Sequence, residues 1–287
     1  MSGMSWKDGP SEADLEQFET RMRTDVPTEP PPLESAYERQ ELGDALCNEG
    51  RVREAITHYR KAVEMERDNP GYHTRLGDAY ACSEMSVRAV LEYRKAIKIS
   101  PRRAEPHFSL AEIYRRYGKW VAAVAEYRKA TQFNAMNPFY RYKLADALWH
   151  IGLYDEALLH METSVQIVPS DGFYHFRLGD MYGRLGRIGD AIIELQQATI
   201  FCPLDSHYSF RLALVYLRGG FPGDAVEALR RAIGLKPDEP MYHAVLAEAY
   251  RALGDIERSE IHQSYAEEMD SYDVASLAVV RKHEGCR

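Results

Sequence analysis

The chain has 287 residues, of which 45% are apolar and 28% charged, a composition typical of a folded protein rather than a disordered one. Its formal net charge of −8 argues against nucleic acid as the main partner, because binding to phosphates requires a basic surface. No apolar stretch approaches the roughly 18–20 residues that span a bilayer, so we expect no direct membrane insertion. The four cysteines lack Cys-x-x-Cys spacing and are expected to be free thiols of a cytoplasmic protein.

Residues 1–35 are expected to form an acidic tail that contains several prolines. Three cations and eight acids give this stretch a net charge of −5, which is most of the charge of the chain. Its start lacks the apolar core of a secretory signal. A short helix over 11–23 would place Leu15, Phe18 and Met22 on one apolar stripe, and the prolines that follow favour a stiff, extended linker. Two interpretations remain open: a mostly disordered leader, or a short helix that docks on this chain or on another.

Residues 36–269 contain a repeat of fixed length. A leucine recurs every 34 residues without insertion or deletion, each time followed by Gly or Ala. The seven leucines are Leu42, Leu76, Leu110, Leu144, Leu178, Leu212 and Leu246. A period in this range is typical of stacked helical hairpins. We number each repeat 1–34 with this leucine at position 7.

Within a repeat, apolar residues at positions 3, 7, 10, 11 and 14 predict the buried face of a first helix. Glycine at position 15 is expected to end that helix, because glycine accepts the left-handed conformation at no steric cost. Repeat 2 has Glu84 instead, so its turn is expected to differ slightly. Alanine at positions 20 and 27 predicts a closely packed second helix, which proline at position 32 ends in most repeats.

This pattern of Leu-Gly/Ala, Tyr, Gly, Ala, Ala and Pro resembles the tetratricopeptide repeat (TPR) family. The resemblance covers residues 36–269 and implies an all-α fold, a right-handed α-solenoid of seven TPR helical hairpins. Residues 270–287 are expected to add a C-terminal capping helix and tail. The chain departs from the family at position 4, where the family favours Trp and most repeats here have His or Arg. Tyr at position 3 is expected to supply the missing bulk.

No motif for catalysis, a cofactor or a metal stands out in the sequence. There is no P-loop, dinucleotide-binding glycine motif, zinc-protease motif or nucleophile elbow. His73, His107, His175 and His243 occupy the same position of different repeats. Equivalent positions should lie about 10 Å apart, too far for two histidines to share a metal with bonds of about 2 Å. The chain is therefore expected to be non-enzymatic, with no cofactor.

Positions 2, 5, 9, 12 and 13 of the first helix lie on one side, and by resemblance to the family that side lines a concave groove. Aromatic and basic residues gather there and at position 6, mainly in repeats 3–6. The candidate partner-binding residues are Phe108, Tyr142, Phe176, Phe210, Phe139, Phe173, Trp149, Arg116, His150, Arg184, Arg218, Arg75, Lys143, Arg177 and Arg211. As an alternative, the rings at position 5 pack between repeats, and cations at position 6 pair with acids three residues on, such as Arg75 with Asp78. The position-13 residues have no obvious partner within the chain, which favours the groove.

These features favour a scaffold or adaptor whose groove in repeats 3–6 binds an extended or helical peptide, acidic and aromatic in character. Binding of chaperone carboxylate tails is not expected, because no repeat has the Lys at position 5 and Asn at position 9 that such family members use. The alternative is a structural or assembly subunit that organises a larger multi-subunit complex, which could include an enzyme. Self-association, with the acidic tail in the groove of its own or a neighbouring chain, is a related hypothesis.

Overall fold

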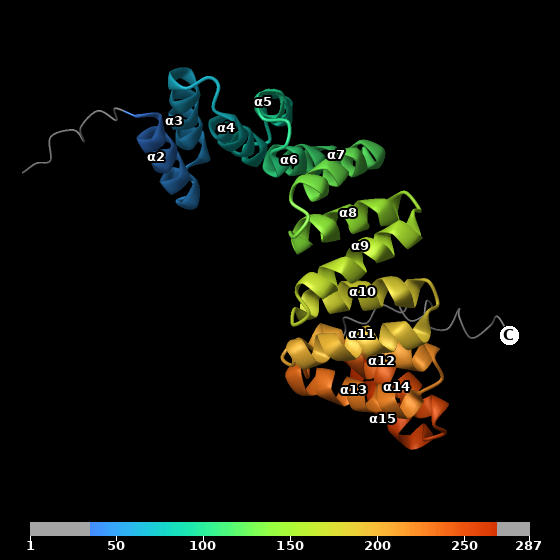
Figure 1. Ribbon diagram of the computed structural model, residues 1–287. Coiled ribbons are helices and arrows are strands. Elements are labelled where there is room, and N and C mark those ends of the chain that lie inside the picture. The colour runs from blue at the N-terminus through green and yellow to red at the C-terminus, as the bar shows by residue number, and fades with distance from the viewer. Residues whose placement is uncertain (1–34, 269–287) are drawn as a thin grey trace, which may run out of the picture.

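The computed structural model describes residues 35–268, which form fourteen helices and no strand (Figure 1). In chain order they are α2 (Ala36–Asn48), α3 (Val52–Met65), α4 (Pro70–Cys82), α5 (Ser86–Ile99), α6 (Ala104–Arg116), α7 (Trp120–Phe133), α8 (Pro138–His150), α9 (Tyr154–Ile167), α10 (Gly172–Arg184), α11 (Ile188–Phe201), α12 (Ser206–Arg218), α13 (Pro222–Leu235), α14 (Pro240–Ala252) and α15 (Ile256–Glu268). The expected tail helix over 11–23 and the capping helix over 270–287 lie outside the described residues.

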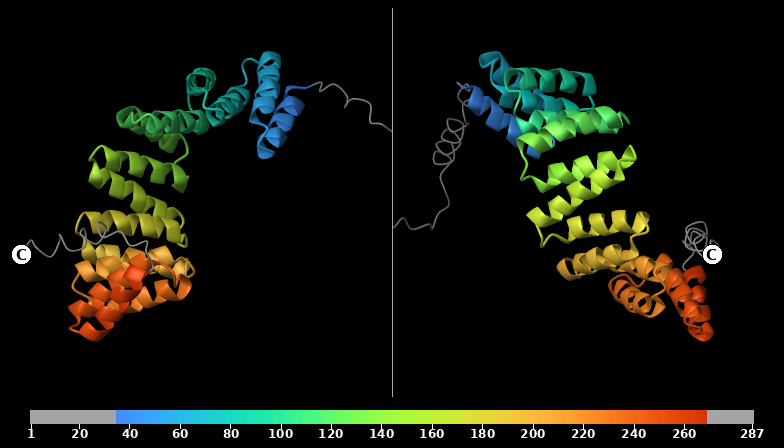
Figure 2. Two further views of the ribbon diagram at one scale, coloured as in Figure 1. Left: turned by 180° about the vertical axis from the view of Figure 1, so that it is seen from behind. Right: turned by 45° about the vertical axis from the view of Figure 1, so that its right-hand side comes forward.

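Consecutive helices pair as hairpins, one for each 34-residue period, and the hairpins stack into a curved array. Figures 1 and 2 show α2–α7 as one arm of the arc and α8–α15 as the other. Each helix also packs on the next helix along the chain, so every hairpin contacts the hairpins before and after it. The α-solenoid expected from the sequence is confirmed.

The turn between the two helices of each hairpin has the same geometry in all seven repeats. Six of the turns use the expected glycine in the left-handed region, with φ between 68° and 81°. Glu84 takes the same conformation in repeat 2, with φ of 61°. The expectation that this turn would differ is therefore wrong: its hydrogen-bonding pattern is kept and glutamate bears the conformational cost.

The core follows the predicted pattern with one exception. Six of the seven framing leucines are buried, and the alanines at position 20 of repeats 1–6 are fully buried between the two helices. A small residue is needed at position 8, since a Cβ on Gly77 would lie 2.5 Å from the ring of Tyr93. Leu42 is the exception, with 37% of its surface exposed. It belongs to repeat 1, which has no described hairpin before it.

Histidine at position 4 of the first helix contacts both the second helix of its own repeat and the loop that precedes the repeat. The ring of His73 lies 2.6 Å from the carboxylate of Glu92 on α5 and 2.9 Å from the carbonyl oxygen of Arg67, in the loop before α4. His107 and His175 make the same two contacts in their own repeats. In each of these repeats both ring nitrogens of the histidine thus face acceptors. The residue that departs from the family pattern therefore has a structural role in joining helices and repeats.

Candidate functional site

The predicted aromatic residues of repeats 3–5 form a continuous row of rings. The ring of Phe139 lies 5.7 Å from that of Phe108 and 6.1 Å from that of Tyr142. Tyr142 in turn meets Phe173 edge-on at 5.0 Å. These residues come from α6, α8 and α10, the first helices of three successive hairpins. Phe139 and Phe173 are 44% and 36% exposed, so the row presents ring surface to solvent.

The aromatic side chains at position 5 are less exposed to solvent than those at position 2. Phe108, Phe176 and Phe210 are half-buried, and each packs against the tyrosine at position 3 of the next repeat. Phe108 and Phe176 are stacked on these tyrosines with ring centroids 4.5 Å apart. The alternative that position 5 packs between repeats is thus borne out by the geometry, and these rings serve as a support for the exposed ones.

The cations at position 6 pair across repeats and not along their own helix. Arg177 contacts Asp146 at 2.9 Å and Lys143 contacts Glu112 at 3.4 Å, in each case with position 9 of the preceding repeat. Arg211 pairs with Asp180 and Arg75 with Asp44 in the same way. The expected partners three residues on were therefore wrong. Adjacent first helices are close enough for the side chains to bridge, and these ion pairs link repeat 1 to repeat 2 and repeats 3 to 6 to one another.

Three of the four predicted residues at position 13 have partners within the chain, contrary to expectation. Arg116 donates to the carbonyl oxygen of Ala81 at 3.4 Å, and Arg184 pairs with Asp180 at 3.1 Å. His150 stacks on Trp120 with ring centroids 3.9 Å apart. Among the residues that the structure describes, neither Arg116 nor Arg218 has an acid within 4.0 Å. Arg116, His150, Arg184 and Arg218 remain exposed, so the row is still accessible to a partner.

The predicted Trp149 lies at the far end of the same helices. Its ring packs on Tyr154 at 4.7 Å, and the guanidinium of Arg184 lies 5.9 Å from the ring centroid. Arg177 and Lys143 are placed in the same way over Tyr142 and Phe139. Cations over aromatic faces contribute about 0.5–1 kcal/mol each at exposed sites. The surface therefore alternates ring and cation along α8 and α10.

The pKa values of two acids at position 9 are shifted in opposite directions. Burial acts to raise the pKa of Glu112, but hydrogen bonds from Arg115 and Tyr127 and the charge of Lys143 outweigh it and hold the pKa below its usual value. At Asp78, burial dominates and raises the pKa despite hydrogen bonds from Tyr93 and Ser109. Position 6 of repeat 3 is Ser109 instead of a cation. The cation–acid pairing of the groove is therefore interrupted at repeats 2 and 3.

Several contributors were missed in the sequence. Trp120 and Tyr154 begin second helices, yet they pack against the predicted His150 and Trp149. His207, at position 2 of repeat 6, meets Phe176 edge-on at 5.4 Å. His207 follows the position-2 series of Phe139 and Phe173, so the register was a signal that could have found it. Trp120 and Tyr154 share position 17, but the candidate positions in the sequence all belong to the first helix.

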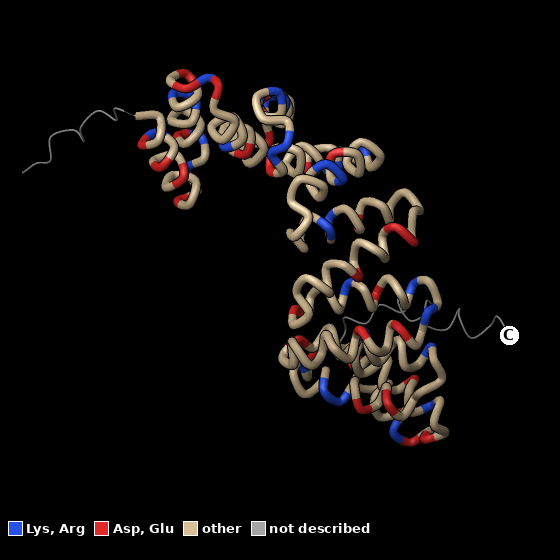
Figure 3. The backbone as a smooth tube through the Cα atoms, in the orientation of Figure 1, with Lys and Arg blue, Asp and Glu red and all other residues tan. Residues whose placement is uncertain are grey.

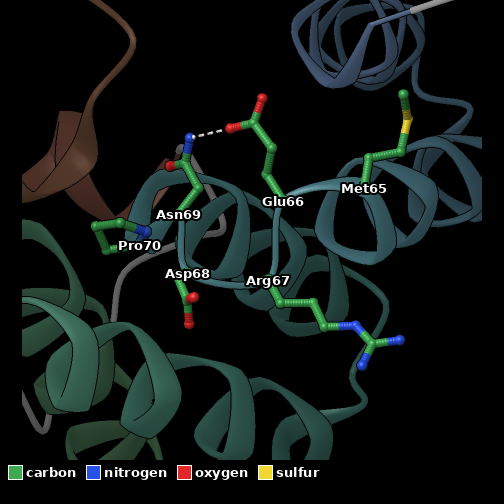
Figure 4. A pocket seen from close by; sticks show the side chains of 6 residues that line it. All are labelled: Met65, Glu66, Arg67, Asp68, Asn69 and Pro70. Carbon is green, nitrogen blue, oxygen red and sulfur yellow. Dashed lines mark hydrogen bonds between the residues drawn. The ribbon is translucent and has the colours of Figure 1, made fainter.

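The structure has a further pocket outside the predicted groove. Figure 4 shows a pocket formed by the loop between α3 and α4, where the side chains of Glu66 and Asn69 meet through a hydrogen bond of 3.1 Å. Within residues 35–268, no three His, Cys, Asp or Glu side chains are placed to hold a metal ion, and no helix is long and apolar enough to cross a membrane. Cys47, Cys82 and Cys202 are free thiols.

Comparisons with known proteins agree with this architecture. A TPR repeat model matches residues 43–81, and a tetratricopeptide repeat model matches 210–274. Comparison with curated proteins gave no match.

Three solved structures illustrate the likeness in fold. A MamA structure from Desulfovibrio magneticus RS-1 is 20% identical, with a TM-score of 0.55 over 58% of this chain and 94% of that one. YrrB, a TPR protein with an unusual peptide-binding site, is 19% identical, with a TM-score of 0.58 over 67% and 97%. The Cut9–Hcn1 hetero-tetramer of the APC/C is 18% identical, with a TM-score of 0.56 over 83% and 46%. Identities this low show the fold alone.

The family does not rest on fold alone. Its models match at both ends of the array, and between them the 34-residue register, the turn glycines and the buried alanines continue unbroken. The chain belongs to the tetratricopeptide repeat family.

Proposed function

We propose that the chain is a non-enzymatic scaffold that binds an extended or helical peptide segment in the groove of repeats 3–6. TPR folds are generally non-catalytic and bind protein or peptide partners. The observation that carries the proposal is the row of rings from Phe108 to Phe173, with Phe139 and Phe173 exposed. Exposed aromatic side chains held rigidly by neighbours are the usual anchors of protein interfaces, because they bury much apolar area at little entropic cost.

The same surface favours a partner that combines acids with aromatic or apolar residues. Arg116, Arg184 and Arg218 are exposed along one edge of the groove. Arg184 and Arg211 share the single acid Asp180, which leaves positive charge uncompensated there. Rings of the partner would meet the row of repeats 3–5, and its acids would meet this edge. YrrB's peptide-binding site supports peptide binding as a use of the fold.

The test is selection of binders from a random-peptide display library, followed by titration of the best peptide. Peptides rich in acids and aromatics should be enriched. Replacing both exposed rings, Phe139→Ala with Phe173→Ala, should weaken binding at least about tenfold, since anchor residues contribute roughly 2 kcal/mol or more. The matched control is Leu159→Ala with Ile193→Ala, which removes exposed apolar side chains from α9 and α11. Equal loss of binding in both double variants would refute the groove as the site.

The three arginines are tested separately. The triple variant of Arg116, Arg184 and Arg218 to Glu should abolish enrichment of acidic peptides and leave the far-ultraviolet circular dichroism unchanged, because all three side chains are exposed. An unchanged affinity for acidic peptides would show that the charge of this edge does not select the ligand.

A structural or assembly role is the second candidate. Leu159, Ile193 and Ile200 are exposed on the second helices of repeats 4 and 5, and exposed apolar surface often marks an interface. The likeness to Cut9, a subunit of a hetero-tetramer, agrees with such a use. Light scattering after size exclusion of native material discriminates the two: an adaptor elutes largely as a free chain, and an assembly subunit elutes in a larger complex.

A further inference from the structure

The exposed face of α5 is basic and apolar, and the net charge of this helix is the highest among the described second helices. Val87 and Leu91 are 78% and 53% exposed, and Arg88, Arg94 and Lys98 lie among them. The helix contains four cations and one acid, a net charge of +3. The single acid, Glu92, is buried and already bonded to His73 and Lys95. Figure 3 shows the basic segments of α5 and of the loop that follows it.

Much of this positive charge is uncompensated. Among the described residues, Arg88, Arg94, Lys98 and the neighbouring loop residue Arg102 have no carboxylate within 4.0 Å. Arg94 only donates to the hydroxyl of Tyr114, at 3.2 Å. In the groove, by contrast, most cations are already paired with acids of the preceding repeat. Among the described residues, four cations without a carboxylate partner therefore lie on or beside α5, and two, Arg116 and Arg218, lie among the candidate residues of the groove.

A cleft continues this face toward repeat 1. It lies between the ends of α3 and α5, where Val63 and Ile99 supply apolar surface. Its lining also contains three cations and two acids, which are Arg67, Lys95, Lys98, Glu64 and Asp68. Figure 4 shows the side chain of Arg67 directed away from Glu66 and Asn69, the two residues that bond to each other across the loop. Because the cations outnumber the acids, the cleft suits an apolar side chain with an acid beside it.

The N-terminal segment joins the described chain beside this cleft. Ala36, the first residue of α2, is buried in one cluster with Ala62 and Tyr72, and Val63 of the cleft packs against the same cluster. Residues 1–34 could extend for at most about 110 Å, far more than the length of α5, which is about 20 Å. The length of residues 1–34 is therefore sufficient for this segment to lie along the whole of α5.

We propose that residues 1–34 bind in cis along α5 and into the α3–α5 cleft. Their charge of −5 complements the +3 of α5. The helix that the sequence predicts over 11–23 would place Leu15, Phe18 and Met22 on one stripe, between acids that would meet the cations of α5. The contact is independent of peptide binding in the groove. It places the tail on the outer side of repeats 1 and 2, in contrast to the groove position that the sequence alone suggested.

The proposal is tested by hydrogen–deuterium exchange of the full chain at low salt. The reference is a synthetic peptide of residues 1–34. Amides of residues 12–22 should exchange about tenfold more slowly in the chain than in the peptide. Because exposed charges are screened beyond about 3 Å at 1 M salt, this protection should fall at that concentration.

Two variants with equal charge change identify the surface. Lys98→Glu with Arg102→Glu should return residues 12–22 to the exchange rate of the free peptide. The control, Arg53→Glu with Lys236→Glu, alters exposed cations on α3 and after α13 and should keep the protection. Protection that survives Lys98→Glu with Arg102→Glu overturns the proposal, as does exchange of the wild-type segment at the peptide rate. Protection that falls on tenfold dilution also overturns it, because binding would then be to a second copy.

Discussion

At the scale of single residues, positions 4 and 23 vary together through the array. Where position 23 is glutamate, position 4 is histidine: His73 with Glu92, and likewise in repeats 3 and 5. Where position 23 is histidine, in repeats 1, 4 and 7, position 4 is Arg39, Arg141 or His243. A guanidinium nitrogen of Arg141 lies 3.5 Å from the ring of His160, and a ring nitrogen of His243 lies 3.1 Å from the ring of His262. The first kind of contact strengthens when histidine is protonated, and the second weakens.

The contact of His73 with Glu92 should therefore stabilise the fold within a limited pH window. The hydrogen bond from Glu92 raises the pKa of His73 above 6.5, so this contribution is complete below pH 6.5 and is lost as the pH rises through the raised value. Burial acts to raise the pKa of Glu92, but the bonds from His73 and Lys95 outweigh it and lower the pKa below 4.5. That contribution is lost as the pH falls below 4.5. The pair should stabilise most between pH 4.5 and 6.5.

Glu92→Gln keeps the shape of the contact and removes its charge. We expect a loss of about 1–2 kcal/mol in the free energy of unfolding at pH 5.5, and a smaller loss at pH 9, where a smaller fraction of His73 is protonated. Urea unfolding followed by circular dichroism measures both values. Glu227→Gln on α13 is the control, since Glu227 is exposed and lies 4.0 Å from Arg231. A loss of equal size at the two pH values would contradict the assignment.

The contacts at position 4 also show which interactions between residues could not be predicted from the sequence. His73 and its equivalents recur at the repeat period, and from this the sequence correctly predicted that they lie in different hairpins. Their acceptors could not be predicted, because Glu92 lies 19 residues away on another helix and Arg67 contributes only its backbone carbonyl. The pairing of Arg177 with Asp146 was missed for a similar reason: the distance between neighbouring first helices is a property of stacking and not of one helix.

At the scale of elements, the turn between helices is set by backbone conformation more than by side-chain contacts. A Cβ added to Gly152 would meet nothing within 4 Å, so the demand for glycine comes from φ alone. Glu84 fulfils the same demand without being glycine, with φ of 61°. The sequence therefore predicted the ends of the first helices well, and failed only in assuming that a different residue meant a different turn.

We expect substitutions at these two positions to change the free energy of unfolding in opposite directions. Glu84→Gly should raise the free energy of unfolding by about 1 kcal/mol, because it relieves a left-handed conformation that costs a non-glycine residue about 1–2 kcal/mol. Gly152→Ala should lower it by a similar amount, since φ is 81° there. Thermal and urea unfolding of the two single variants measure the changes. If Glu84→Gly destabilises the chain, contacts of the glutamate side chain must matter more than the strain of its backbone.

At the scale of the whole molecule, the 34-residue period was enough to predict an α-solenoid, because each hairpin packs mainly on its neighbours and the same residues recur at each contact. The exposed row of rings was predicted in part. Phe139 and Phe173 remain available, whereas Phe108 and Phe176 are covered by tyrosines of the next repeat. How much of a ring remains exposed depends on the angle between hairpins, and no single repeat specifies that angle.

The array should also unfold in parts when its middle is weakened. In stacked repeats, stability is approximately a sum of repeat and neighbour terms, so a weak central repeat separates two stable ends. Leu144 of repeat 4 is 1% exposed within the largest core cluster, and Leu144→Ala should remove about 2–5 kcal/mol. Leu42→Ala truncates a residue already 37% exposed, and because it lies in the first described hairpin it should cost less and fray only that end.

Hydrogen exchange in increasing urea, resolved by peptide, distinguishes these outcomes. In Leu144→Ala, peptides of α8 and α9 should lose protection at a lower urea concentration than peptides of α4 and α12, so that one transition becomes several. In Leu42→Ala, only peptides of α2 and α3 should shift. If both variants instead shift all peptides together, the chain unfolds as one cooperative unit. The links between repeats, such as those of Arg177 and His73, would then be strong enough to override the independence of single hairpins.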